Sequence, residues 1–368
     1  MLIPMEDVAR KFVGQRIAVE DLLAFSVATM RAFHISEEHA RQTAEVLVAA
    51  DTWGTHSHGT RQLVPLMHNV VHNALRADAQ PEVVTEGPGF VLVNGNYAMP
   101  MVTSRLAMGM AMEKARTAGI AYAAVQHSGH YGAAGYYALM AAEENMIGIS
   151  MSNVDVCMTV PGAKAPVIGT NPLAYAVPAG REKPVFLDIA TSVVAISKVI
   201  AAKTAGQPIP EGWLVDAEGN PTTNTSTYPD QGSILPMAGH KGYGIALLIE
   251  ILSGVLSGAA FLSGIKGWLQ PEPEPADEGH SFIAVNVESL MPLTQFQDRM
   301  DQMIHEVRSA PRAAGAERIY LPGEMELERR EVALRQGIAL PDYVLINLFK
   351  IAADAGLTDK LKGMFYSS

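Results

Sequence analysis

The chain has 368 residues, of which 48% are hydrophobic and 18% are charged. A chain of this length and composition is not intrinsically disordered, and its length favours two structural units over one. The formal net charge of −11 argues against binding to a nucleic-acid backbone, which needs a basic surface. It leaves room for a small anionic substrate, because such a molecule responds to a local Arg or Lys.

The first 80 residues favour helices. Apolar side chains recur at helical spacing in residues 19–33, and Ser36 is a suitable N-cap for a second helix that runs to Ala50. Residues 63–71 predict a third helix, and the polar stretch that ends at Pro81 is the first candidate domain boundary.

Beyond Pro81 the pattern changes to short strands and intervening helices. Residues 204–228 are rich in Pro, Gly, Thr and Asn, and they predict a long ordered loop or lid. The expected strands are 82–85, 89–95, 120–125, 147–151, 185–189 and 282–286, and the expected helices are 101–118, 135–144, 326–336 and 341–355.

Residues 244–265 are apolar enough and long enough to span a membrane, and they contain the packing pattern Gly254-x-x-x-Gly258. Glu250 near the middle would cost about 2.5–3.5 kcal/mol on insertion, and no second span accompanies the segment. We therefore expect a buried helix here and no membrane partner.

Two features bear on location. The single cysteine, Cys157, excludes an internal disulfide and cannot form a thiolate zinc site by itself. Residues 1–10 carry acidic side chains where a secretory signal would carry basic ones, and no apolar stretch follows them. We therefore expect a protein that is not exported and that lies in the reducing cytoplasm.

The stretch from Asp51 to Gln62 concentrates groups that move protons or bind acids. His58 can exchange a proton near neutral pH, and Ser57 can donate or accept a hydrogen bond. Arg61 can bind a planar carboxylate with two parallel N–H bonds. The stretch therefore predicts the active site of an enzyme that acts on a small carboxylic acid.

A metal-dependent hydrolase is the alternative from another class. His56 and His58 form a His-x-His pattern, and His68 and His72 stand one helical turn apart. The first pair follows a helix instead of a strand, and no Glu lies between the second pair. We therefore expect no metal.

Several later segments combine turn-forming residues with groups that can bind anions. Gly169-Thr-Asn-Pro172 and Asp188-Ile-Ala-Thr-Ser192 follow this pattern at strand ends, and Lys241 could hold a phosphate or be solvated. Asp188 could orient an imidazole or cap a helix over residues 191–201. His127-Ser-Gly-His130-Tyr-Gly-Ala-Ala-Gly135 has glycines at every third position, unlike the Gly-x-Gly-x-x-Gly of a Rossmann turn, and no P-loop is present.

These motifs, in their order along the chain, resemble the malate/L-lactate dehydrogenase family. This is the type-2, non-Rossmann group that also includes ureidoglycolate, sulfolactate and hydroxycarboxylate dehydrogenases, diketogulonate reductase and piperideine-2-carboxylate reductase. The resemblance runs from about residue 20 to about residue 350, and it rests on the motifs Ser57-His58-Gly59…Arg61, Gly129-His130…Gly135-Tyr136-Tyr137, Gly169-Thr-Asn-Pro172, Asp188…Ala190-Thr191-Ser192 and Lys241-Gly-Tyr-Gly244.

The resemblance implies an α/β fold with a non-Rossmann, NAD(P)-binding mixed-sheet domain and a helical domain from both chain ends. Residues 1–80 with 326–368 would form the helical domain, and residues 81–325 would form the inserted nucleotide-binding domain. The implied enzyme transfers hydride between NAD(P)H and C2 of a small 2-oxo acid, or of a cyclic 2-imino acid such as piperideine-2-carboxylate. NAD and NADP both remain open as cofactors, and a homodimer is implied.

Residue roles follow from the same resemblance. His58 is the implied acid/base, Asp188 its orienting carboxylate and His130 a second catalytic candidate, while Ser57 and Arg61 would bind substrate. The implied cofactor contacts are Thr170, Asn171, Leu187, Asp188, Ile189, Ala190, Thr191, Ser192, Val193, His240, Lys241, Gly323, Glu324 and Met325.

Overall fold

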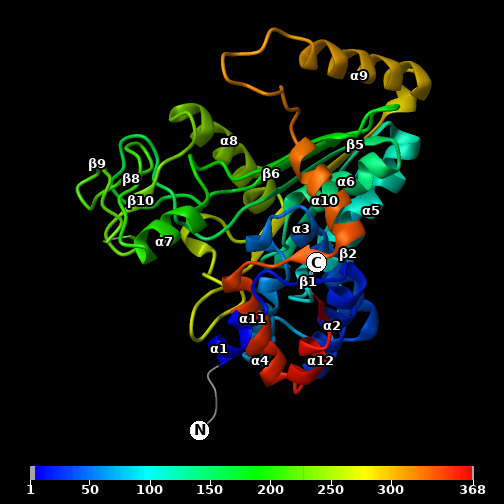
Figure 1. Ribbon diagram of the computed structural model, residues 1–368. Coiled ribbons are helices and arrows are strands. Elements are labelled where there is room, and N and C mark those ends of the chain that lie inside the picture. Colours follow the sequence, from blue (N-terminus) through cyan, green and yellow to red (C-terminus); the bar gives the residue numbers. More distant parts are fainter. Residues whose placement is uncertain (1–4, 227, 367–368) are drawn as a thin grey trace.

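The computed structural model describes residues 5–226 and 228–366. Its centre is a seven-stranded sheet with the strand order β2-β3-β4-β11-β5-β6-β7 (Figure 1). Strands β3 and β4 run parallel, whereas the other neighbouring strands run antiparallel. The α/β class with a mixed sheet is thereby confirmed.

The elements have the following bounds. The helices are α1 (Met5–Arg10), α2 (Val19–Ala32), α3 (Glu37–Thr52), α4 (Leu63–Val71), α5 (Pro100–Ala118), α6 (Ala134–Glu143), α7 (Ile196–Thr204), α8 (His240–Glu250), α9 (Leu293–Arg308), α10 (Glu324–Gln336), α11 (Asp342–Asp354) and α12 (Thr358–Lys362). The strands are β1 (Arg16–Ile17), β2 (Glu82–Gly87), β3 (Phe90–Asn94), β4 (Ile120–Ser128), β5 (Met146–Ser152), β6 (Leu173–Val177), β7 (Val185–Ile189), β8 (Leu214–Val215), β9 (Pro221–Thr222), β10 (Ser233–Ile234), β11 (Glu278–Asn286), β12 (Ile338–Ala339) and β13 (Phe365–Tyr366).

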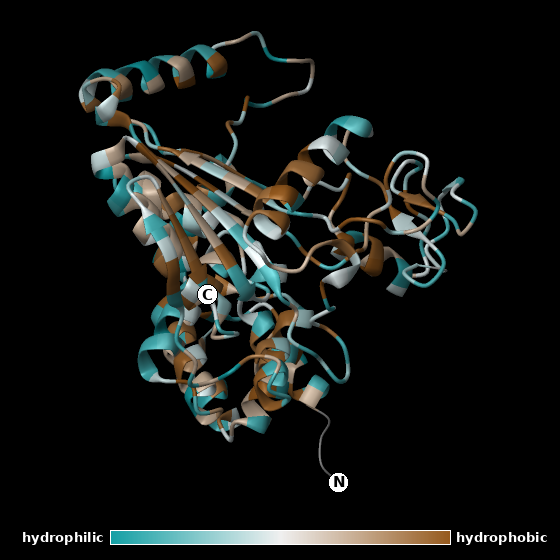
Figure 2. Ribbon diagram, turned by 180° about the vertical axis from the view of Figure 1, so that it is seen from behind, coloured by the Kyte–Doolittle hydropathy of each residue, from teal (hydrophilic) through white to brown (hydrophobic). Residues whose placement is uncertain are grey.

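The sheet is covered on both faces. Helices α5 and α6 pack on one face, with α3 behind them, and the α8 region lies on the other. The two central strands carry small or apolar inward side chains, including Ala123 on β4 and Phe282 on β11, both 0% exposed. Figure 2 shows this apolar interior as brown strands between the helical layers. The two histidine motifs follow α3 and β4, so this packing brings them toward the same region.

Both ends of the chain meet in one region. The short strand β1 pairs with β12 on one side and with β13 on the other, and α1 packs on α11. This arrangement agrees with a helical unit built from both termini. The division at residues 80 and 325 stays a prediction, and its residues 1–4 and 367–368 lie outside the described part of the chain.

The expected single helix over residues 244–265 is wrong. Helix α8 ends at Glu250, a π-helical turn covers residues 251–255, and Gly258 then takes a φ of +81° and turns the chain back. The buried carboxylate of Glu250 accepts hydrogen bonds from the side chain of Asn171 at 2.7 Å and from the backbone N–H of Leu262 at 2.8 Å. Within residues 5–226 and 228–366, every helix is too short or too polar to cross a membrane.

Several other elements differ from the sequence expectations. The predicted loop at 204–228, whose Thr227 lies outside the described residues, contains β8 and β9, and these strands form a small sheet with β10. The helix considered for residues 191–201 begins only at Ile196. The sequence patterns also missed β6 and the long helix α9. Helix α9 buries the apolar side chains Met300 and Ile304 on one side, so the sequence carried a helical pattern here that the prediction did not use.

Candidate active site

The turn after α3 is held by one buried carboxylate. Asp51 is 2% exposed, and its Oδ1 lies 2.8 Å from His56 Nδ1. Its Oδ2 accepts hydrogen bonds from the backbone N–H of Thr60 at 2.8 Å and from the Thr60 hydroxyl at 2.6 Å. A Cβ on Gly59 would lie 2.1 Å from Asp51 Oδ1, so only glycine fits there. Asp51 and His56 therefore support the turn that presents Ser57 and His58.

The turn brings the predicted catalytic and substrate-binding groups together. Ser57 Oγ lies 2.9 Å from His58 Nδ1, and the ring of His58 stacks on that of His130 with centroids 5.4 Å apart. The guanidinium of Arg61 lies 5.8 Å from the centre of the Tyr343 ring. Helix α3, strand β4 and helix α11 thus each contribute to one site, although they are far apart in the sequence.

Both imidazoles are held in the neutral form. Burial and the nearby positive charge of Arg61 lower the pKa of His58 to about 4. Burial also lowers the pKa of His130 well below its usual value, with further contributions from His58, His280 and Arg61. A carboxylate bound at Arg61 would offset part of this repulsion and raise both pKa values.

The sequence motifs missed one wall of this site. The indole of Trp268 stacks on His130 with ring centroids 4.3 Å apart and planes 19° apart. Its loop is tied to α4, because Asn69 Nδ2 donates to the Trp268 carbonyl at 2.9 Å and His68 Nε2 lies 3.0 Å from the Pro271 carbonyl. An isolated Trp before a Pro/Glu-rich stretch gave no signal for this contact.

Asp188 bonds to the segment that follows His130, and the role of orienting His58 that the family resemblance implies stays a prediction. Its Oδ2 accepts the backbone N–H of Gly135 at 2.8 Å, and no hydrogen bond or ion pair joins Asp188 to His58 in the described part of the chain. Burial raises the pKa of Asp188 to about 6, while the Gly135 hydrogen bond opposes this rise. Asp188 therefore fixes the start of α6, which follows the His130 turn.

Two of the predicted cofactor segments lie together. The carbonyl of Thr170 accepts the backbone N–H of Thr191 at 2.9 Å and the Thr191 hydroxyl at 3.0 Å. The side chain of Asn171 is 0% exposed, and it bonds to the backbone N–H of Val154 and to the carboxylate of Glu250. Asn171 therefore supports this region from inside.

The region around residues 187–193 also approaches the start of α8. The backbone N–H of Met237 donates to the carbonyl of Thr191 at 2.9 Å, and that of Val193 donates to the carbonyl of Leu235 at 2.8 Å. His240 and Lys241 are exposed at the first positions of the eleven-residue helix α8. A helix N-terminus with a lysine beside it suits a phosphate group.

The predicted loop 323–325 packs against β7. Gly323 has a φ of +81°, and a Cβ there would lie 2.2 Å from the ring of Phe186, so this position requires glycine. Met325 and His56 line a shared cavity of about 360 Å³ between α10 and the turn after α3. The loop is therefore next to both β7 and that turn.

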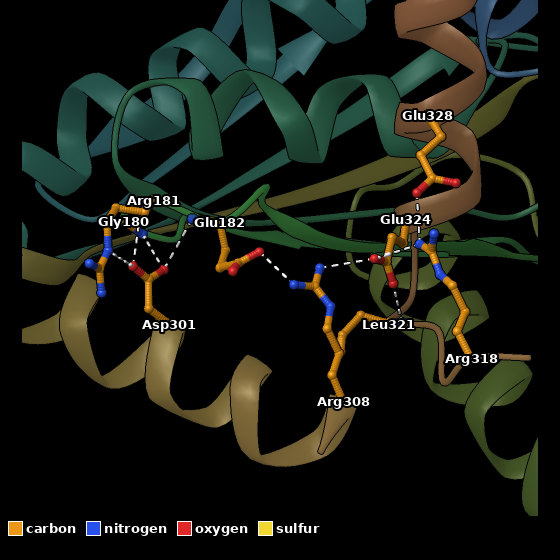
Figure 3. Close-up of polar contacts among 9 residues, drawn as sticks. All are labelled: Gly180, Arg181, Glu182, Asp301, Arg308, Arg318, Leu321, Glu324 and Glu328. Carbon is orange, nitrogen blue, oxygen red and sulfur yellow. Dashed lines mark hydrogen bonds and ion pairs between the residues drawn. The ribbon is translucent and has the colours of Figure 1, made fainter. Parts of the chain in front are cut away.

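Glu324 belongs to a network of charged side chains (Figure 3). Its Oε1 lies 2.9 Å from Arg308 Nη2 and 2.7 Å from Arg318 Nη2, and its Oε2 accepts the backbone N–H of Leu321 at 2.9 Å. The network continues along α9 to Asp301, whose carboxylate accepts backbone N–H groups from residues 180–182. The carboxylate of Glu324 thus anchors α9 and α10 around the loop.

The four histidines of the hydrolase alternative do not converge. His56 bonds to Asp51, His58 stacks on His130, and His72 Nδ1 lies 2.9 Å from the His68 carbonyl. Among residues 5–226 and 228–366, no group of three or more His, Cys, Asp and Glu side chains is placed to hold a metal ion. The geometry gives no support to a metal-dependent hydrolase.

Comparison with known proteins places this site in a family. The malate dehydrogenase of Pyrococcus abyssi is 37% identical over 349 residues, which cover 93% of this chain and 95% of that protein. A Δ1-pyrroline-2-carboxylate/Δ1-piperideine-2-carboxylate reductase of Pseudomonas putida is 32% identical over 90% of this chain and 96% of its own length. The structure of sulfolactate dehydrogenase from Methanocaldococcus jannaschii superposes with a TM-score of 0.87 at 32% identity, covering 94% of this chain and 98% of that one. The family model for malate/L-lactate dehydrogenase matches residues 17–348, and the chain therefore belongs to the malate/L-lactate dehydrogenase family.

Proposed function

We propose that this protein is a nicotinamide-dependent oxidoreductase that interconverts a small 2-oxo acid and the corresponding 2-hydroxy acid. The observation that carries the proposal is the convergence of Ser57, His58, Arg61 and His130 at one site. The relatives named above are dehydrogenases and reductases of malate, sulfolactate and cyclic imino acids. These compounds share a carboxylate next to the reacting carbon.

Arg61 binds the substrate carboxylate in this proposal. Its guanidinium presents a planar set of donors, and its charge acts on both His58 and His130. A carboxylate paired with Arg61 places C2 beside the two imidazoles, and the Ser57 hydroxyl is close enough to His58 to bond to the same substrate. Fixing the acid in this way supplies the orientation that hydride transfer requires.

His58 is the proposed proton donor during reduction. Its Nδ1 faces Ser57, which leaves Nε2 for the oxygen or nitrogen on C2 of the substrate. His130 stacks on it and is the second candidate. Asp188 accepts the backbone N–H of Gly135 and so supports the segment that follows His130. Substrate binding at Arg61 raises the pKa of the donor, so the proton is taken up where it is needed.

In this proposal, the cofactor-binding region is formed by the residues of this chain that match the family's cofactor-binding motifs. NADH or NADPH, when bound, supplies the hydride to C2. Lys241 and the first turn of α8 can hold a pyrophosphate, while residues 187–193 and 323–325 form the adjoining walls. The exposed backbone and cation fit a dinucleotide without a Rossmann turn. Neither residue set discriminates NAD from NADP.

The experiment measures loss of NADH and of NADPH absorbance with purified protein and a panel of acids. The panel contains oxaloacetate, pyruvate, sulfopyruvate and an aromatic 2-oxo acid. We expect turnover with at least one of them, and a preference for one cofactor will be read from kcat/KM. Binding of both cofactors without turnover on any member of the panel would contradict the proposal.

A cyclic 2-imino acid is the second candidate substrate on the same site. The Pseudomonas putida reductase supports it, because that relative spans nearly the whole chain. Such a substrate keeps the carboxylate for Arg61 and replaces the C2 oxygen by a ring nitrogen. Piperideine-2-carboxylate belongs in the same panel, and a kcat/KM above that of every 2-oxo acid would establish this alternative.

A homodimer is proposed as the functional assembly. Helix α8 and the turn that follows it expose several large apolar side chains, namely Leu248, Ile251, Val255 and Leu256, which are 45–60% exposed. Figure 2 shows this brown, apolar character along the helix. Contiguous apolar surface of this kind marks protein contacts, and its closeness to Lys241 would place the contact beside the cofactor region.

A further inference from the structure

Strand β11 carries a buried histidine that the family motifs and the proposed reaction leave without a role. His280 is 0% exposed, and both of its ring nitrogens have hydrogen-bond partners. Its Nδ1 lies 2.8 Å from Ser152 Oγ, and its Nε2 lies 2.9 Å from Ser128 Oγ. An imidazole inside a sheet is costly unless both nitrogens are satisfied, so these two serines determine its place.

The hydroxyl of Ser152 determines which nitrogen of His280 carries the proton. Ser152 Oγ lies 2.8 Å from the carbonyl of Asn153 and 3.3 Å from that of Gly279. Because carbonyl oxygens only accept, Ser152 uses its single proton there and accepts the Nδ1–H of His280. The Nε2 atom then accepts from the Ser128 hydroxyl. Burial lowers the pKa of His280 to about 3, which keeps the ring in this neutral form.

His280 contacts the chain on both sides of His130. Ser128, its hydrogen-bond donor, lies two residues before His130. Tyr131 lies one residue after it, and the rings of Tyr131 and His280 stack with centroids 4.3 Å apart and planes 3° apart. The Tyr131 hydroxyl is itself 3.2 Å from Ser150 Oγ. The backbone that presents His130 is therefore held at both ends by one side chain.

The strand that leads to His130 is irregular at the same place. In the pairing of β4 with β11, His280 faces Val125 and Glu278 faces Ser128, so a bulge forms at Gln126 and His127. His127 has a φ of +53°, which a side chain adopts only when its surroundings hold it. A bulge redirects the residues that follow it. His280 pairs with Val125 immediately before this bulge, and its side chain bonds to Ser128 immediately after it, which is where the direction of His130 is set.

We propose that His280 is a positioning residue that fixes the orientation of His130 for the reaction, acting through Ser128 and Tyr131. The inference rests on the proposed function, in which His130 borders the reacting carbon. His280 touches neither substrate nor cofactor. Its loss therefore affects kcat and the titration of His130 more than it affects cofactor binding.

Two substitutions test the positioning. His280→Phe keeps an aromatic ring to stack on Tyr131 and removes both hydrogen bonds, and Ser128→Ala removes only the bond nearest His130. We expect each to lower kcat by about 10–100-fold, the usual effect of removing a group that orients a catalytic residue. The Kd for NADH or NADPH should stay close to that of the unmodified protein. Both changes break the same hydrogen bond. The double variant should therefore have a kcat close to that of the more impaired single variant.

A measurement that does not depend on turnover accompanies the kinetics. The imidazole of His130 is titrated by NMR in the unmodified protein and in both variants. Ser128→Ala should shift the apparent pKa of His130 toward its ordinary value, because the ring becomes more mobile and better hydrated. His280→Phe also removes the electrostatic contribution of His280 to that pKa, so the Ser128 variant decides the comparison. If His280→Phe does not fold, Ser128→Ala carries the test alone.

Ser253→Ala is the matched control. Ser253 is 0% exposed like His280, and its hydroxyl bonds to Ser281 at 3.2 Å on the opposite face of β11. This substitution should lower stability without changing kcat or the His130 titration. Turnover in the unmodified protein with an unchanged kcat and His130 pKa in both test variants would overturn the positioning role. Absence of turnover in the unmodified protein would reject the proposed function, while the NMR comparison would still decide the positioning.

Discussion

His58 and His130 stack next to each other, and the charge of Arg61 acts on both imidazoles. The ring centroids are 5.4 Å apart, and Arg61 contributes to the lowered pKa of each ring. Three positive charges at this spacing would repel one another, so the free site keeps both imidazoles neutral. A carboxylate at Arg61 removes part of that repulsion. In the proposed function, binding of the substrate acid at Arg61 would therefore raise the pKa of its proton donor.

Removing the imidazole of His58 tests this role. We expect His58→Ala to lower kcat by about 10²–10⁴-fold, the usual contribution of a positioned general acid. Steady-state kinetics with the preferred acid and cofactor measure the effect, with His130→Ala assayed in parallel. If the His58 variant keeps its turnover and the His130 variant loses it, the two roles are exchanged.

The buried carboxyl of Asp188 predicts a pH-dependent stability. Its pKa is raised to about 6, from an ordinary value of 3.8. A group whose folded-state pKa is raised stabilises the fold fully below its unfolded pKa, and this contribution is lost as pH rises through the folded pKa. The free energy of unfolding should thus lose about 1–3 kcal/mol from this group between about pH 4 and pH 7.

The test compares Asp188→Asn with the unmodified protein by urea denaturation across that pH range. Asn can still accept the N–H of Gly135, so the variant removes the charge and keeps the hydrogen bond. The variant should gain stability relative to the unmodified protein as pH rises from about 4 to 7. A difference that does not change with pH would show that Asp188 titrates as in the unfolded chain.

The sequence predicted the chemistry of single residues better than their contacts. His58, Ser57 and Arg61 stand close together in the chain, so their shared location follows from one turn. Trp268 and Asp188 reach the region through loops and strands separated from that turn by more than a hundred residues. Such contacts depend on tertiary packing, which no local pattern records. This is why the contact of Trp268 with His130 and the hydrogen bond of Asp188 to Gly135 were not predicted.

The turn after α3, which carries Ser57 and His58, depends on close packing between Gly59 and Asp51. A Cβ at residue 59 would lie 2.1 Å from the carboxylate. Gly59→Ala should therefore destabilise the protein by about 1–3 kcal/mol, as overpacking of a buried site does. Gly109→Ala is the control, because residue 109 lies in α5 with no atom within 4 Å of the added Cβ. Thermal unfolding should show a lower Tm for the first variant and an equal or higher Tm for the control.

Helices and strands with a clear local pattern were predicted well. Ser36 caps α3 as expected, its side chain accepting the N–H of His39, and Gly119 ends α5 with a φ of +83°. The apolar stretch 244–265 failed because its ending depends on distant partners: Glu250 bonds to Asn171 and to a backbone N–H beyond the turn. The expected burial of this segment is also wrong, because Leu248, Ile251, Val255 and Leu256 are 45–60% exposed. A hydrophobic run alone determines neither burial nor the end of a helix.

The buried apolar side chains of the described residues form two clusters. One cluster joins the helices of both chain ends to the sheet, and it extends from Ala9 to Leu361. A second, smaller cluster lies between residues 158 and 246, under α7 and the small sheet. The family resemblance gave the overall architecture, but side-chain packing makes the helical layer and the sheet share one core.

The exposed apolar face of α8 predicts how two copies meet. Leu248 is 54% exposed, and Leu248→Glu places a charge where we propose subunit contact. Light scattering after gel filtration should show a dimer for the unmodified protein and a shift toward monomer for the variant. Leu290→Glu is the control, because Leu290 is 81% exposed on a turn before α9 and away from α8. Dimers of equal stability in both variants would place the subunit contact elsewhere.

Strand β11 lies between β4 and β5, although it follows them by more than 120 residues in the chain. During synthesis, β4 and β5 leave the ribosome with open edges and no strand between them. The sheet can close only after residue 286 is available, and the same event brings His280 against Ser128. Insertion of β11 thus completes the sheet and brings His280 against Ser128 in one step, and a chain that ends before β11 leaves one edge of β4 and one edge of β5 without a partner strand.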